Sequence, residues 1–240
     1  MTTLLETRGL SAGYGKLAAV RDLDLHVERG EVVALLGPNG AGKSTTLKTL
    51  AGALPPLGGE VVWKGEVTCA PMHRRVRRGL AYVPEERSVF MDLTAAENLR
   101  VGDGPIEKAL ELFPELELHL KRKAGLLSGG QQQILSLARA LATDPDLLLA
   151  DELSLGLAPL VVHRLLEAVQ AAASRGVGVL LVEQHARHAL AVADRVYVLQ
   201  RGRVALQGTA QEILGRLDEV EQTYLEGPSI AAVTDSPTSA

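Results

Sequence analysis

The chain has 240 residues, of which 46% are hydrophobic, enough to fill the core of one α/β domain or slightly more. With 25 basic and 29 acidic residues its net charge is −4, so the overall charge does not favour binding to nucleic acid or to an anionic lipid surface. Cys69 is the single cysteine, which excludes an internal disulfide and a cysteine-based zinc site and is typical of a reducing compartment such as the cytoplasm.

Short β-like segments separated by turns occupy residues 3–27. The segment Leu4–Arg8 precedes Gly9, and apolar residues recur at every second position of Asp22–Val27. We therefore expect an antiparallel sheet at the N-terminus. Tyr14 is predicted in a glycine-flanked loop, where its ring could stack on a purine base or could simply be half-exposed.

A glycine-rich loop follows the apolar run Val32–Leu36 and precedes Thr45–Leu50, which predicts a strand, a loop and a helix. The loop reads Gly37-Pro38-Asn39-Gly40-Ala41-Gly42-Lys43-Ser44. Its spacing, G-x-x-x-x-G-K-[ST], is that of the phosphate-binding P-loop, in which backbone N–H groups and a helix N-terminus face the phosphates. We expect Lys43 to contact the β- and γ-phosphates and the Ser44 hydroxyl to bind Mg²⁺.

Two more strands are expected before residue 87. Glu60–Trp63 leads into a turn at Lys64, and Leu80–Val83 is a buried strand that ends before Pro84. The basic run His73–Arg78 lies on one short predicted helix and contains no aromatic residue. We interpret it as a solvated helix face rather than a nucleic-acid patch.

The hydrophobic period becomes helical between Asp92 and Thr143, which predicts an inserted helical subdomain of about residues 87–145. Thr94-Ala95-Ala96-Glu97 is a capping box, and another helix is expected from Pro105 to Phe113. Ser128 is the expected N-cap of a third helix, whose first turn reads Gly129-Gly130-Gln131.

Polar residues follow two buried strands in the last third of the chain. Asp151 and Glu152 follow Leu147–Ala150, and His185 follows Val177–Val182. Open α/β sheets bind ligands at the carboxyl ends of such strands, and a Mg²⁺-nucleotide site needs an acid there. A helix from Pro159 to about Ala173 separates the two strands and continues a parallel pattern.

The C-terminal part consists of a predicted hairpin over 197–206 and a second capping box, Thr209-Ala210-Gln211-Glu212. Residues 227–240 have no hydrophobic period, and we expect them to form a disordered tail. One domain is therefore predicted over residues 1–226. No run approaches the ~18 apolar residues of a membrane span, so any spans are expected from another subunit.

The order of these motifs resembles that of the nucleotide-binding subunits of ABC transporters across roughly residues 3–226. A P-loop alone leaves kinases, GTPases and helicases open, but Leu127-Ser128-Gly129-Gly130-Gln131 ahead of Asp151-Glu152 is specific. The resemblance implies an α/β fold with a P-loop NTPase (RecA-like) core, a mainly parallel sheet, an N-terminal antiparallel β subdomain and an inserted α-helical subdomain. It also implies an ATPase that uses ATP and Mg²⁺.

The resemblance gives roles to individual residues. Lys43, Glu152 and His185 are the implied catalytic residues, with Glu152 polarising the attacking water. Ser44, Asp151 and Glu85 are the metal candidates, although most members have Gln in place of Glu85. Tyr14 is the implied contact for adenine. The implied contacts for the phosphates are Gly37, Pro38, Asn39, Gly40, Ala41, Gly42, Lys43, Ser44 and Thr45. The nucleotide of a second subunit, packed head to tail, is the implied partner of Ser128, Gly129, Gly130 and Gln131.

Other segments resemble one branch of the family. Ala81–Glu85 and Ser154–Pro159 resemble the shorter ATP-binding subunit of branched-chain amino acid importers. The resemblance implies a subunit held at the cytoplasmic face of the cell membrane by separate permease subunits, without membrane insertion of its own. Leu153 and Ala158 replace a usual Pro and Asp, so some polar contact across the dimer is expected to be missing.

Three alternatives stay open. The chain could serve an importer of urea, amides or another solute, because nothing in the sequence touches a transported molecule. It could also be a soluble ABC ATPase acting on ribosomes or DNA, although those usually carry two nucleotide modules or a long coiled-coil insertion. A regulatory nucleotide binder without turnover is disfavoured by the intact Lys43, Glu152 and His185. The sequence does not decide whether the dimer partner is identical or homologous.

Overall fold

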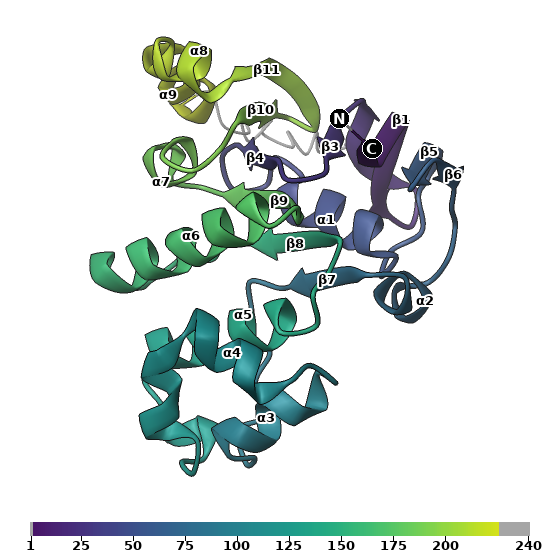
Figure 1. Ribbon diagram of the computed structural model, residues 1–240. Helices are drawn as coiled ribbons and strands as arrows, with labels where there is room; N and C mark the ends of the chain where they lie inside the picture. The colour runs from purple at the N-terminus through teal and green to yellow at the C-terminus, as the bar shows by residue number, and fades with distance from the viewer. Residues whose placement is uncertain (1, 226–240) are drawn as a thin grey trace, which may run out of the picture.

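The structure is a computed structural model that describes residues 2–225. The tail predicted at 227–240 lies outside the described residues. Two sheets and a separate group of helices make up the molecule (Figure 1). Among the described residues, no helix is both long enough and apolar enough to cross a membrane.

The N-terminal sheet is antiparallel throughout, as expected. Its five strands are β1 (Thr3–Tyr14), β2 (Leu17–Leu23), β3 (His26–Glu28), β5 (Gly58–Trp63) and β6 (Glu66–Val67). β1 is longer than predicted and ends at Tyr14, which pairs with Leu17 across a two-residue turn. Tyr14 is therefore the last residue of a strand and not part of a loop, because pairing with β2 extends the strand past Gly13.

The second sheet has the strand order β11-β10-β4-β9-β8-β7 and is parallel except at its β11 edge. Its strands are β4 (Val32–Leu36), β7 (Leu80–Val83), β8 (Leu147–Asp151), β9 (Gly178–Glu183), β10 (Arg195–Gln200) and β11 (Arg203–Thr209). Every residue of β4, β8 and β9 is buried, as continuous apolar runs predict for the centre of a parallel sheet. The carboxyl ends of these three strands therefore lie side by side.

Helices cover both faces of this sheet. α1 (Lys43–Ala51) packs on one face, in a core that it shares with the antiparallel sheet. The other face carries α6 (Pro159–Ser174) and α5 (Gly129–Leu141). The remaining α-helices are α2 (Met72–Arg77), α3 (Ala95–Val101), α4 (Ile106–Leu112), α7 (Ala186–Leu190), α8 (Ala210–Leu214) and α9 (Leu217–Leu225).

The predicted helical subdomain is formed by α3, α4 and α5 with two short 3₁₀ segments, 114–119 and 124–126, and it lies at one end of the molecule (Figure 1). The capping boxes at Thr94 and Thr209 are both present. Ser128 caps α5 as predicted, with Gln131 completing the box. Pro105 precedes α4 as its N-cap and is not its first residue.

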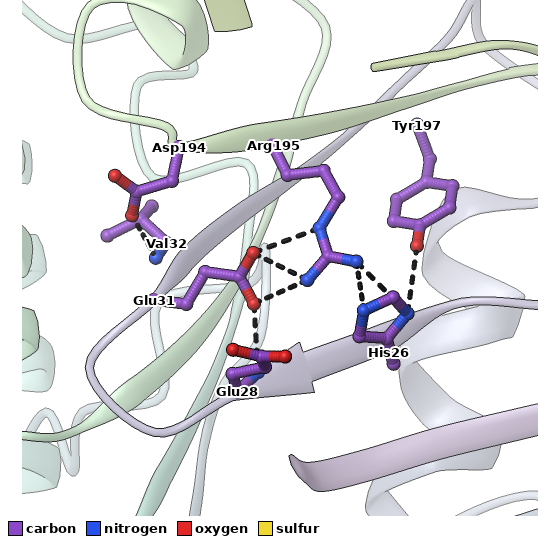
Figure 2. A network of polar contacts seen from close by, with 7 residues as sticks. All are labelled: His26, Glu28, Glu31, Val32, Asp194, Arg195 and Tyr197. Carbon is purple, nitrogen blue, oxygen red and sulfur yellow. Dashed lines mark hydrogen bonds and ion pairs between the residues drawn. The ribbon is translucent and has the colours of Figure 1, made fainter. Parts of the chain in front are cut away.

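A polar network fixes the amino-terminal end of β4, away from the P-loop (Figure 2). Arg195 contacts the Glu31 carboxylate through two nitrogens, with Nε–Oε1 at 2.9 Å and Nη2–Oε2 at 2.6 Å. The Arg195 guanidinium also contacts the ring of His26. The neighbouring Asp194 accepts a 2.8 Å hydrogen bond from the Val32 amide. Bidentate pairs between arginine and a carboxylate are stronger than neutral hydrogen bonds. This pair joins β10 to the turn between β3 and β4.

Arg75 departs from the interpretation of residues 73–78 as a solvated helix face. Its guanidinium is buried and donates to the backbone carbonyls of Ala70 at 2.8 Å and Leu50 at 2.6 Å, with longer contacts to Thr49 and Thr68. Burial lowers the pKa of Arg75. The carbonyls of Thr49 and Leu50 belong to the last turn of α1, where the helix dipole favours a cation. Arg75 therefore ties α2 to the end of the P-loop helix.

We predict that Arg75→Met destabilises the fold by about 2 kcal/mol or more, because the carbonyls lose their donor while the side-chain volume is roughly kept. The measurement is the free energy of unfolding in urea. Arg74→Met is the matched control, because Arg74 is exposed on the same helix. Equal losses of stability in the two variants would contradict the assignment.

Candidate functional site

The P-loop joins β4 to α1 at the carboxyl edge of the parallel sheet. Gly37, Gly40 and Gly42 have φ of +151°, +80° and +103°, which other residues rarely adopt. A Cβ on Gly37 would lie 2.4 Å from the Leu199 carbonyl oxygen, and one on Gly42 would lie 2.4 Å from a methyl group of Val20. The loop thus packs too closely on β10 and β2 to accept a side chain at Gly37 or Gly42, whereas at Gly40 only the backbone conformation favours glycine.

Lys43 is 5% exposed and has three polar neighbours. Its ammonium group donates to the carbonyl oxygens of Gly37 at 2.9 Å and Pro38 at 3.3 Å. The Glu152 carboxylate lies 3.5 Å from the same nitrogen. Because an unpaired buried cation is costly, these neighbours explain how Lys43 stays inside the loop.

Two carboxylates extend from the end of β8. Asp151 is its last residue, and Glu152 follows in the left-handed region at φ +45°. Burial, the largest influence, and the nearby Glu152 carboxylate raise the pKa of Asp151, whereas the Ser44 hydroxyl and Lys43 lower it, and the net result is a pKa of about 6. The site therefore concentrates negative charge next to one buried cation.

Lys43 and Glu152 line a cavity of about 490 Å³, whereas Asp151 does not. Its lining includes Glu85 and Glu152 from the sheet edge, and from the P-loop region Asn39, Gly40, Gly42, Lys43, Ser44 and Thr45. Ala19, Leu155 and Gln184 also line it, and we did not predict them. Leu155 and Gln184 come just after β8 and β9, so the carboxyl-end rule could have found them. Ala19 on β2 carries no such signal.

The other predicted site residues do not line this cavity. Tyr14 is 54% exposed at the end of β1. His185 is exposed just before α7, with its ring 5.4 Å from that of His188. Ser128, Gly129, Gly130 and Gln131 form the start of α5 in the helical subdomain, where the Ser128 amide donates to Gln131 Oε1 at 2.9 Å. One chain alone therefore assembles only part of the predicted site.

The donor atoms at the sheet edge fit Mg²⁺. Asp151 Oδ1 is buried and has no hydrogen-bond partner among the described residues, and the Ser44 hydroxyl contacts the same carboxylate. Within residues 2–225 no group of three or more His, Cys, Asp or Glu side chains forms a metal cage. Mg²⁺ commonly takes one or two protein ligands together with substrate phosphates and water, which matches this sparse donor set.

Comparison with known proteins agrees with this geometry. The sequence profile described as "ABC transporter" matches residues 20–154. The high-affinity branched-chain amino acid transport ATP-binding protein BraG of Pseudomonas aeruginosa is 42% identical over 228 residues, covering 91% of this chain and 97% of the relative. The lipopolysaccharide export system ATP-binding protein LptB of Acidithiobacillus ferridurans is 38% identical over 236 residues, covering 94% and 98%.

A solved structure adds the state in which such a cassette operates. The dimeric, post-hydrolysis ATP-binding cassette MJ0796, bound to ADP and Pi, superimposes with a TM-score of 0.76 at 25% identity, covering 86% of this chain and 99% of that one. The fold, the P-loop and the relatives agree with one another. The chain therefore belongs to the ABC transporter family and is an ATP-binding cassette that hydrolyses ATP.

Proposed function

We propose that the chain powers the uptake of branched-chain or related amino acids through separate membrane subunits, at the cytoplasmic face of the cell membrane. The observation that carries this proposal is the similarity to BraG along nearly the whole chain. A second candidate, the export of a lipopolysaccharide, is favoured by the similarity to LptB over a comparable length. The two differ in the cargo and in the membrane subunits, but not in the chemistry of the ATP site.

The catalytic part of the proposal gives each residue at the sheet edge one task. Lys43 would leave the Glu152 carboxylate and neutralise the β- and γ-phosphates, aided by the N–H groups of the P-loop. Glu152 would then be free to orient and polarise the attacking water. His185 and Tyr14 do not line the cavity, and we assign them to the γ-phosphate and to the adenine, respectively, of bound ATP. Ser44, Asp151 and Glu85 are the residues that would hold Mg²⁺, which supplies charge neutralisation when bound.

Ser128, Gly129, Gly130 and Gln131 are assigned to a second subunit. Ser128 and Gly129 begin α5, a 13-residue helix whose N-terminus is a favourable position for an anion. They lie outside the cavity that holds Lys43, so we assign them to the γ-phosphate bound by the partner's P-loop. The partner is an identical or a homologous cassette, packed head to tail. Nucleic acid has no place in this proposal.

The cargo is tested by purifying the tagged chain from membranes together with the subunits that accompany it and reconstituting the complex in liposomes. We expect leucine, isoleucine or valine, presented with the cognate binding protein, to stimulate ATP hydrolysis. Acidic amino acids are the negative control. Stimulation by lipopolysaccharide and by none of the amino acids would overturn the importer proposal and support the second candidate.

We predict that Lys43→Ala weakens ATP binding by about 10- to 100-fold, because the loop loses the only charged side chain among its eight residues while its backbone dipoles remain. Affinity is measured by isothermal titration calorimetry. Lys48→Ala is the matched control, because Lys48 is exposed on the same helix and outside the cavity. Affinity for ATP that stays within a few-fold of the parent would refute the role of Lys43.

A further inference from the structure

Glu183 is a buried carboxylate whose function the ATP site does not yet explain. It is the last residue of β9 and is 1% exposed. It pairs in register with Leu36, the residue that precedes the P-loop, and its strand also pairs with β8. Glu183 therefore lies at the carboxyl ends of the three central strands, behind the residues that line the cavity.

The Glu183 carboxylate holds Ser154 through two hydrogen bonds. The Ser154 amide donates to Oε1 at 3.1 Å, and the Ser154 hydroxyl donates to Oε2 at 2.6 Å. Ser154 is itself buried and lies two residues after Glu152. Both oxygens of the carboxylate are thus committed to one residue of the loop that follows β8.

Burying the Glu183 carboxylate close to two other carboxylates is unfavourable for the stability of the fold. Burial, the largest influence, and the carboxylates of Glu152 and Asp151 raise the pKa of Glu183, whereas the hydrogen bonds from Ser154 lower it, and the net result is a pKa of about 7. A neutral amide or a backbone carbonyl could satisfy Ser154 without placing a third carboxyl group in the same region. The position therefore supplies the two contacts with Ser154 rather than a charge.

The loop of residues 152–154 is attached to β9 at both ends. At its start, the Glu152 amide donates to the Val182 carbonyl at 2.9 Å. At its end, Ser154 is held by Glu183. Between these points Glu152 adopts φ +45°, a conformation that costs energy for a residue other than glycine and persists only where its surroundings enforce it. The two attachments provide that enforcement, and they leave the Glu152 carboxylate 3.5 Å from Lys43.

We propose that Glu183 is a positioning residue for ATP hydrolysis, which acts through Ser154 to hold the loop so that the Glu152 carboxylate faces the ATP cavity. The inference rests on the catalytic role of Glu152 in the proposed function. It assigns no contact with ATP to Glu183, because Glu183 does not line the cavity. Loss of the hydrogen bonds between Glu183 and Ser154 should consequently reduce the rate of hydrolysis and not the affinity for ATP.

The test compares kcat and ATP affinity in Glu183→Ala, Ser154→Ala and the double variant. Each single change should lower kcat by about 10- to 100-fold, as misplacement of a reacting group does, with the Kd for ATP nearly unchanged. The double variant should be no slower than the slower single variant, because both changes remove the same contact. Glu183→Gln should recover most of the rate, since an amide can still pair with the Ser154 amide and hydroxyl.

Thr7→Val is the control for a general loss of stability. Thr7 is buried in the antiparallel sheet, where its hydroxyl donates to the Leu23 carbonyl at 2.8 Å and accepts from the Leu25 amide at 2.9 Å. This variant should lose comparable stability and keep the parental kcat. Rates are expressed per folded molecule, with folding followed by circular dichroism. If Glu183→Ala does not fold, Ser154→Ala decides the question.

Unchanged kcat in Ser154→Ala, or losses that add in the double variant, would overturn the inference. Glu152→Gln is assayed in parallel to separate this failure from a failure of the proposed function. A slow Glu152→Gln beside a fast Ser154→Ala rejects only the role of Glu183. A Glu152→Gln variant that turns over ATP at the parental rate rejects the catalytic role on which the inference depends.

Discussion

The charge balance around the buried ammonium group of Lys43 is the constraint on which the rest of the site depends. The P-loop places this cation inside the protein, where two loop carbonyls and the Glu152 carboxylate compensate for its lost hydration. The same compensation holds Glu152 next to the position where phosphates bind in P-loop proteins. In the proposed mechanism ATP would compete with Glu152 for Lys43, and binding of the substrate would release the carboxylate to polarise water.

Parallel strands explain why so few residues suffice for this arrangement. β4, β8 and β9 end at the same edge, and a different part of the site follows each strand. The P-loop follows β4, Asp151 and Glu152 lie at the end of β8, and Glu183, which contacts Ser154, ends β9. Every residue of the three strands is buried, and such central strands are the last parts of a protein to open. Short loops attached to them can hold a strained residue such as Glu152 in one conformation.

Much of the fold and of the candidate site could be predicted from the sequence, because the motifs that indicate them are local. The G-x-x-x-x-G-K-[ST] spacing, the Ser128 cap and the acids after β8 each depend on residues within a few positions of one another. The burial of Arg75 could not be predicted, because a run of charged residues is typical of an exposed helix face. Its carbonyl acceptors also come from other segments of the chain. Glu183 has no local sequence signal either, because its partner Ser154 is 29 residues away in the chain. In the proposed dimer the site is completed by α5 of a second cassette, and no residue pattern within one chain fixes the position of a partner.

The most direct test of the account is the oligomeric state of Glu152→Gln in ATP and Mg²⁺, measured by size-exclusion chromatography with light scattering. The variant keeps the shape of the side chain but should not activate water. Each nucleotide should therefore stay bound between the P-loop of one cassette and helix α5 of its partner. The account predicts a persistent particle of two cassettes, formed with itself or with the homologous subunit, whereas the parent chain separates after hydrolysis. A variant that hydrolyses ATP and separates like the parent in both settings would contradict it.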